Sequence, residues 1–191
     1  MRALCGARFR SVAASVEGTQ LARSGQPLNT ISLLSNANLE NGAMTTDRFE
    51  EFGWHDNAIH AFRISDGDDG CSGNLILDID YILEWISPSA QDGNFSFVVP
   101  PADLVFLEVT DLVISIDYAS SSAALQPMTI DEISREVVTY PNGYSEFAWK
   151  IELNWPEESF ISFRSPRMSQ ALKGESVRST SQSLMPPQRT V

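Results

Sequence analysis

The chain has 191 residues, of which 42% are hydrophobic, and a formal net charge of -12. That length suits one domain with a core, with or without tails. Residues 44–172 hold 22 Asp and Glu against six Lys and Arg, so we expect no nucleic-acid binding, because an acidic surface repels phosphate backbones. The same acidity suits a basic protein partner, whose encounter it would speed.

Two further absences narrow the class. No apolar run approaches the roughly 18 residues that a membrane helix needs, so we expect no membrane partner. The two cysteines, Cys5 and Cys71, form neither a disulfide framework nor a zinc-ligand set. We therefore expect a cytoplasmic domain without a cofactor.

The two ends of the chain differ in composition from its middle. Residues 1–43 show no sustained apolar period, and at Met44 the composition becomes acidic and aromatic ("MTTDRFEEFGWHDN"). We predict that Met44 is the natural start and that residues 1–43 are disordered or a mis-assigned upstream extension. Residues 173–191 are rich in Ser, Thr, Gln and Pro, which predicts a disordered tail. The predicted domain is residues 44–172.

Alternation of apolar and polar residues predicts a series of strands with one buried face. The clearest segment is "NLILDIDYILEW", residues 74–85, where every odd position from Leu75 to Trp85 is apolar. A helix would scatter these six side chains around its circumference. The other segments with a strand pattern are 58–64, 94–99, 102–109, 111–117, 145–153 and 159–163.

Turn-forming residues separate these segments. Gly, Pro, Asn and Asp gather at 65–74, 87–94 and 140–144, as hairpin turns require. About seven or eight short strands joined in this way predict an all-β, antiparallel sandwich or barrel with disordered termini. Residues 129–138 are ambiguous, because a capping box and helical spacing compete with a strand that has a bulge near Glu132. We favour the strand.

The acidic residues of the clearest strand are the first candidates for a site. Asp78 and Asp80 share one face with Cα atoms about 6.6 Å apart, close enough to share a metal or a proton, whereas Glu84 lies about 13 Å beyond Asp80. The alternative is a solvated face, or cross-strand pairing with basic residues. The candidate basic residues are Arg63, Arg135 and Lys150. We favour this alternative, with the acids facing water or a partner.

A second candidate is "GWHDNAIH", residues 53–60. The His55-Asp56 pair resembles the metal-binding pair of certain phosphohydrolases, but the further His and Asp ligands of those sites are missing. A metal site is conceivable by ligand type alone. Its ligands would be His55, Asp56, His60, Asp78 and Asp80. We expect instead that Trp54 anchors the start of the domain and that His55 hydrogen-bonds locally.

Three segments together resemble a small family of uncharacterised bacterial proteins. They are "FGWHDNAIHAFRI", "LILDIDYILEW" and "PPADLVFLEVTDLVISID", which match a WHD opening, an LDIDYI-x-x-W strand and a P-A-x-LVF stretch. The likeness spans residues 49–165 and carries no catalytic residue across. The WHD opening also resembles, more weakly, immunity-type proteins from toxin–antitoxin neighbourhoods, which implies a binding role.

Two functions follow from these features. The first is a non-enzymatic, acidic protein-binding domain of the immunity type that engages a basic partner. It predicts one exposed acidic cluster with few internal cations, made of Asp78, Asp80, Glu84 and Asp117. The second is a metal-dependent, hydrolase-like site built from His55, Asp56, Asp78 and Asp80, which would have to converge in a pocket. The first is favoured because the catalytic inventory is thin.

Overall fold

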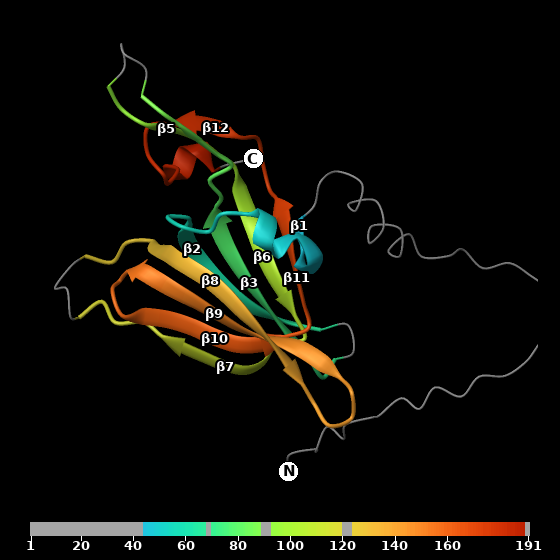
Figure 1. The fold of residues 1–191 in the computed structure, drawn as a ribbon. Helices are drawn as coiled ribbons and strands as arrows, with labels where there is room; N and C mark the ends of the chain where they lie inside the picture. The colour runs from blue at the N-terminus through green and yellow to red at the C-terminus, as the bar shows by residue number, and fades with distance from the viewer. Residues whose placement is uncertain (1–43, 68–69, 89–92, 120–123, 190–191) are drawn as a thin grey trace, which may run out of the picture. The chain divides into compact units, whose positions relative to one another are not determined.

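The computed structural model describes residues 44–67, 70–88, 93–119 and 124–189, which belong to one compact unit, Gly42–Val191 (Figure 1). In this part of the chain β-strands dominate, and the helical elements are two 3-10 helices, η1 (Thr46–Glu51) and η2 (Pro186–Gln188). None of the helices in the described ranges is long and apolar enough to cross a membrane. The predictions for residues 1–43 lie outside the described residues.

All strand pairings are antiparallel, which confirms the predicted fold class. The strands formed by the described residues are β1 (Met44–Thr45), β2 (Ala58–Asp66), β3 (Gly73–Asp80), β4 (Glu84–Ile86), β5 (Ser96–Val99), β6 (Pro101–Leu107), β7 (Thr110–Ser115), β8 (Met128–Thr139), β9 (Ser145–Trp155), β10 (Ser159–Ser165), β11 (Arg167–Leu172) and β12 (Val177–Ser179). Eight of these twelve have six or more residues.

Among these residues the strands form two sheets, a nine-stranded one in the order β1-β11-β6-β3-β2-β8-β9-β10-β7 and a three-stranded one in the order β12-β5-β4 (Figure 1). The large sheet has its edges at β1 and β7, so it is not a closed barrel. Its two parts are joined weakly, because β2 meets β8 only at Ala58↔Thr129 and Ile59↔Met128. Of the two predicted alternatives, the sandwich-like one holds.

The core lies on the face that both parts of the large sheet share. Strands β3 and β6 supply Leu75, Leu77, Leu104 and Phe106, each with no exposed surface. These side chains belong to one cluster with residues of β8, β9 and β10. The residues contributed by those strands include Ile130, Ile133, Trp149, Ile151, Ile161 and Phe163.

The predicted strand over 74–85 is only partly correct. Leu75, Leu77 and Ile79 are fully buried as predicted, but β3 ends at Asp80, and Leu83 and Trp85 are 49% and 48% exposed. The chain leaves the large sheet here because its next amides find other acceptors. The N–H groups of Tyr81 and Leu83 donate to Pro100 and Val98, and that of Ile82 donates to the buried side chain of Asn57.

The ambiguous segment 129–138 lies within β8, which confirms the strand reading. The register against β9 shifts between Ile130 and Glu132, as the predicted bulge requires. At the bulge the backbone of Ile130 turns to the loop before β2. It accepts a hydrogen bond from Asp56 N–H at 2.8 Å and donates one to Asn57 at 3.0 Å.

The prediction of a disordered tail over 173–191 is wrong for residues 173–189, hereafter the C-terminal segment. Strand β12 pairs with β5, and Leu184 is only 3% exposed, in a small cluster with Ile82, Phe97 and Val99. Composition misled because the segment needs only one large apolar side chain, and it uses hydrogen bonds and charges for the rest. The domain therefore extends to Arg189, beyond the predicted limit at 172.

Candidate functional site

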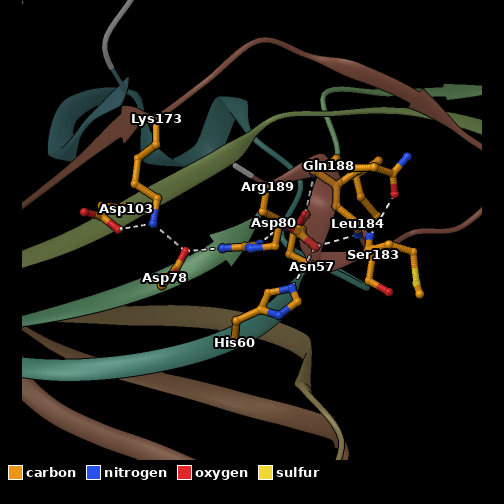
Figure 2. Close-up of polar contacts among 12 residues, drawn as sticks. Asn57, His60, Asp78, Asp80, Asp103, Lys173, Ser183, Leu184, Gln188 and Arg189 are labelled. Atoms are coloured by element: carbon orange, nitrogen blue, oxygen red, sulfur yellow. Dashed lines mark hydrogen bonds and ion pairs between the residues drawn. The ribbon is translucent and has the colours of Figure 1, made fainter. Parts of the chain in front are cut away.

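Three carboxylates gather where β3 and β6 lie side by side, those of Asp78, Asp80 and Asp103. Asp78 of β3 stands directly opposite Asp103 of β6 in the register of the sheet, so the two side chains share a face. Lys173, which follows β11, reaches across both of them. Its Nζ lies 2.6 Å from Asp78 Oδ1 and 3.0 Å from Asp103 Oδ1 (Figure 2).

Arg189 of the C-terminal segment joins the two aspartates of β3. Its Nη2 pairs with Asp78 and its Nη1 with Asp80, and only 14% of its side chain is exposed (Figure 2). Asp80 is fully buried. It also accepts the backbone N–H of Leu184 at 2.7 Å and lies 2.7 Å from His60 Nε2. Every side of this carboxylate therefore faces a group of its own chain.

These contacts shift two pKa values. Partial burial alone would raise the pKa of Asp78, but the hydrogen bond from Lys173 and the charges of Arg189 and Lys173 outweigh it, so the pKa lies below its ordinary value. Burial alone would lower the pKa of Lys173, but its hydrogen bonds to Asp78 and Asp103 outweigh that effect and raise it. Both shifts favour the charged pair.

Asp56 holds a second part of the C-terminal segment. It adopts a φ of 66°, in the left-handed region that Asp tolerates better than most residues. Its Oδ1 accepts a hydrogen bond from Asn154 of β9 at 2.9 Å, and its Oδ2 accepts one from Gln182 at 2.8 Å. His55 Nδ1 lies 3.0 Å from the same carboxylate, which confirms the expected local contact.

Trp54 anchors the start of the domain, as predicted. It is 6% exposed, and its ring stacks on that of Phe49 at 5.5 Å between centroids. Phe49 in turn meets the edge of Trp149 in the core. The turn that carries His55 and Asp56 is thus fixed to the core by the residue that precedes it.

The residues proposed as metal ligands divide into two groups with different neighbours. Asp78 and Asp80 bind Arg189, and His60 lies beside Asp80. Asp56 instead contacts His55, Asn154 and Gln182. No group of three or more His, Cys, Asp or Glu arranged to hold a metal ion occurs among the described residues. Since the carboxylate oxygens already accept hydrogen bonds from the chain itself, nothing in this arrangement favours the hydrolase alternative.

The prediction of one exposed acidic cluster is also wrong. Asp80 is buried, and both Asp78 and Asp80 bind cations of the same chain. Glu84 lies on β4, in the smaller sheet. Asp117 follows β7, five strands from β3 in the sheet order, where its Oδ1 caps the N–H of Ala119. The four acids do not gather.

A surface that the sequence did not reveal lies around His55. Two hollows of about 430 Å³ and 290 Å³ share Phe52 and His55 in their walls. The larger is also lined by Leu83 and Trp85, and the smaller by acidic residues. We call this the His55 surface; the residues that define it are Glu50, Glu51, Phe52, His55, Leu83, Trp85, Asp131 and Glu132.

The His55 surface is acidic, and ion pairs hold two of its acidic side chains. Glu50 and Glu51 pair with Arg135 and Arg48, while Asp131 and Glu132 lie beside His55 and leave the surface a net negative charge. The Arg135 guanidinium also lies over three aromatic rings at 4.6–5.5 Å from their centroids. Those rings belong to Phe49, Phe147 and Trp149.

The signal for this surface is present in the sequence, but the alternation of residues assigns it to the core. "YILEW" continues the alternation of β3, which predicts that Leu83 and Trp85 are buried. They are exposed because the backbone N–H of Ile82 donates to Asn57, a polar residue with no exposed surface, instead of continuing the pairing of β3. No alternation pattern contains that information.

The fold and the two sites together define an antiparallel, sandwich-like β-domain with an acidic surface and a self-bound C-terminal segment. Comparison with known proteins finds no matching protein-family model, no matching curated protein and no matching solved structure. The resemblance to a bacterial family with a WHD opening therefore stays a prediction.

Proposed function

We propose that the domain is a non-enzymatic protein-binding module that engages a basic partner protein through the His55 surface. The observation that carries this proposal is the pair of half-exposed side chains, Leu83 and Trp85, beside a hollow that adjoins acidic residues. An exposed Trp in a hollow with a charged rim is the composition that protein interfaces favour.

Charge supports the basic character of the partner. The domain has a large excess of acids over bases, which would steer a basic protein toward it. At the rim, Glu132 stands opposite Glu152 of β9 in the sheet register. Since Glu152 is already paired with Lys150 of its own strand, Glu132 is the acid of these two that a cationic partner would neutralise.

The resemblance of the WHD opening suggests the form that this binding takes. In an immunity-type role the domain would bind and block a basic toxin inside a bacterial cell, which agrees with the cytoplasmic location expected from the cysteine content. This form of the proposal rests on the resemblance, whereas the choice of surface rests on geometry alone.

Site-specific photo-cross-linking of the full chain tests the proposal. A photoreactive phenylalanine analogue would replace Leu83 in one variant and Leu125 in the other. Leu125 is 84% exposed and is not among the residues of the His55 surface. We expect a cross-linked product with a basic protein from position 83 and none from position 125.

Charge reversal supplies a matched control. Glu132→Lys changes the His55 surface, while Glu136→Lys makes the same charge change on an exposed residue of the same strand, outside both hollows. We expect the first to reduce the cross-linked product at least tenfold and the second to leave it unchanged. Equal products from both positions, or equal effects of both reversals, would refute the assignment.

A further inference from the structure

Besides the contacts of Lys173 and Gln182 described above, the C-terminal segment contacts the rest of the domain at three anchors. The first is the pairing of β12 with β5, in which Val177, Arg178 and Ser179 lie opposite Val99, Val98 and Phe97. Because β12 is the edge strand of the three-stranded sheet, it extends a sheet whose other strands, β5 and β4, pair with each other without it. This is the geometry of strand addition by a peptide.

The second anchor is Leu184. Its side chain is 3% exposed and closes a small apolar socket formed by Ile82, Phe97 and Val99. Its backbone N–H donates to Asp80 in the same place. One apolar side chain in a pocket, fixed by a hydrogen bond from its own backbone, is a typical specificity contact of an extended peptide.

The third anchor is Arg189, five residues further along, whose guanidinium spans Asp78 and Asp80 (Figure 2). Asp80 has no exposed surface, and a buried carboxylate without a cation is costly. The planar, forked guanidinium directs a separate N–H group at each of the two carboxylates. This end of the groove therefore favours an arginine.

Between the anchors most residues are exposed, although Gln182 and Ser183 are half-buried and Gln182 donates to Asp56. Thr180 and Ser181 follow β12 in the exposed class, and Met185, 67% exposed, comes directly after Leu184. Pro186, Pro187 and Gln188 are exposed as well. Buried anchors separated by exposed residues characterise a ligand in a groove, whereas a core strand buries every second residue.

We propose that the groove between β5 and the end of β3 is a peptide-binding site, and that residues 177–189 of the C-terminal segment are its built-in ligand. The site would accept, from a separate protein, an extended segment with a leucine followed five residues later by an arginine. Such a segment would displace residues 177–189. This inference rests on the contacts of the C-terminal segment and does not depend on the His55 surface.

Hydrogen exchange in the unmodified full chain gives the first test. The probe is a synthetic peptide of residues 177–189, added in increasing excess. If the segment detaches while the core stays folded, its amides, including that of Leu184, exchange at least 100-fold faster than those of β9. Their exchange then rises further in proportion to the peptide concentration, because the peptide holds the vacated groove. Exchange of the segment at the rate of β9, unchanged by peptide, would overturn the proposal.

Binding by a full-length variant gives the second test. Leu184→Ala together with Arg189→Ala weakens two anchors, while Met185→Ala changes an exposed neighbour and serves as the matched control. By fluorescence anisotropy we expect the labelled peptide to bind the double variant at least tenfold more tightly than the control. A peptide with alanine at both anchor positions should not bind.

Two outcomes would defeat this reading even if the double variant behaves differently from the control. Loss of the near-ultraviolet signal of the core tryptophans would show that the segment is an integral part of the fold. In size-exclusion chromatography, the variant mixed with peptide could elute as a dimer of full chains. That result would show that a second copy of the chain, and not the separate peptide, occupies the groove.

Discussion

His60 Nε2 lies 2.7 Å from Oδ2 of Asp80, and that carboxylate has no contact with solvent. The two residues belong to neighbouring antiparallel strands, β2 and β3, near the bulge where the β2 register shifts between Ile59 and Ala61. The bulge re-aims the His60 side chain toward Asp80, as bulges commonly do. Asp80 thus links β2 to the C-terminal segment, and its replacement should affect both.

Asp80→Asn is expected to destabilise the domain strongly. The substitution leaves the Arg189 guanidinium, 14% exposed, without its closest counter-charge, and breaking a buried pair in this way typically costs about 3–5 kcal/mol. Urea denaturation followed by tryptophan fluorescence measures the loss. Asp117→Asn, at an exposed acid that lies far from Asp80 in the sheet order, should change stability by less than about 0.5 kcal/mol. Equal effects would contradict the assignment of Asp80 as the link.

Stability should fall in acid partly because of Asp78. Its folded pKa lies below the ordinary value of 3.8, so its charge stabilises the folded state above that value, and the stabilisation is lost as the pH falls through the folded pKa. Asp78→Asn should therefore flatten the pH dependence of the unfolding free energy below about pH 4. Urea titrations at pH values from 2 to 7, spaced about one pH unit apart, would resolve this slope. A variant as acid-sensitive as the original chain would refute it.

Lys173 contributes at the other end of the pH range. Because its pKa is raised above 10.5 by Asp78 and Asp103, its charge stabilises the fold below that value, and the stabilisation disappears as the pH rises through the folded pKa. Lys173→Met should remove this part of the alkaline dependence. The measurement is the midpoint temperature of thermal unfolding at pH values from 8 to 11, spaced about half a pH unit apart. Lys150→Met, at a half-exposed lysine that pairs with Glu152 of its own strand, is the control and should change little.

Arg135→Met is expected to loosen η1 from the core. The guanidinium donates to the carbonyl of Thr46 at 2.7 Å and stacks on aromatic rings of the core, and together these contacts are worth about 2–3 kcal/mol. Calorimetry would show the loss as a lower melting temperature. Arg167→Met removes an exposed pair with Glu108, worth about 0.5 kcal/mol or less. If both variants melted alike, the aromatic contacts would contribute nothing.

Asn57→Ala should disturb the break after β3. Asn57 is fully buried; its Oδ1 accepts the N–H of Ile82 at 2.7 Å and its Nδ2 donates to Trp54 O at 2.8 Å. While Trp54 O keeps the backbone N–H of residue 57 as a donor, alanine would leave the Ile82 N–H without its acceptor, at a cost of about 1–3 kcal/mol. Because this bond directs Leu83 and Trp85 to the surface, the fluorescence of Trp85 should also shift. The spectrum of a Trp85→Phe variant serves as the reference, because it shows how much of the fluorescence comes from Trp85.

The strands of this domain were predictable because their burial is periodic. In β3, β9 and β10 every second residue faces one core, so Leu75, Trp149 and Ile161 reveal themselves by spacing alone. The site was not predictable in the same way. Asp78 and Asp80 were recognised as candidates, but their partners, Lys173 and Arg189, are about 95 and 110 residues away in the sequence. They stand in a segment whose composition suggests disorder.

The His55 surface could not be predicted from the sequence for a related reason. It depends on where a strand stops, and the hydrogen bond that stops β3 comes from Asn57 in a loop 25 residues earlier. Periodicity describes the inside of an element but not its end. The acids of β8, such as Asp131 and Glu132, were visible in the sequence, yet only the register shift in β8 places them beside His55.

The order of strands in the large sheet also bears on how the chain folds. Strands β8 and β9 pair with their immediate successors, β9 and β10, whereas β6 pairs with the distant β11, with Phe106 opposite Met168, and β1 pairs with β11 across most of the domain. Local hairpins form in microseconds, while pairing of distant segments must first overcome the entropy of closing a long loop. The β8–β10 meander is therefore the expected nucleus. The groove that holds residues 177–189 is then completed late, after β11 has docked and brought Lys173 to its aspartates.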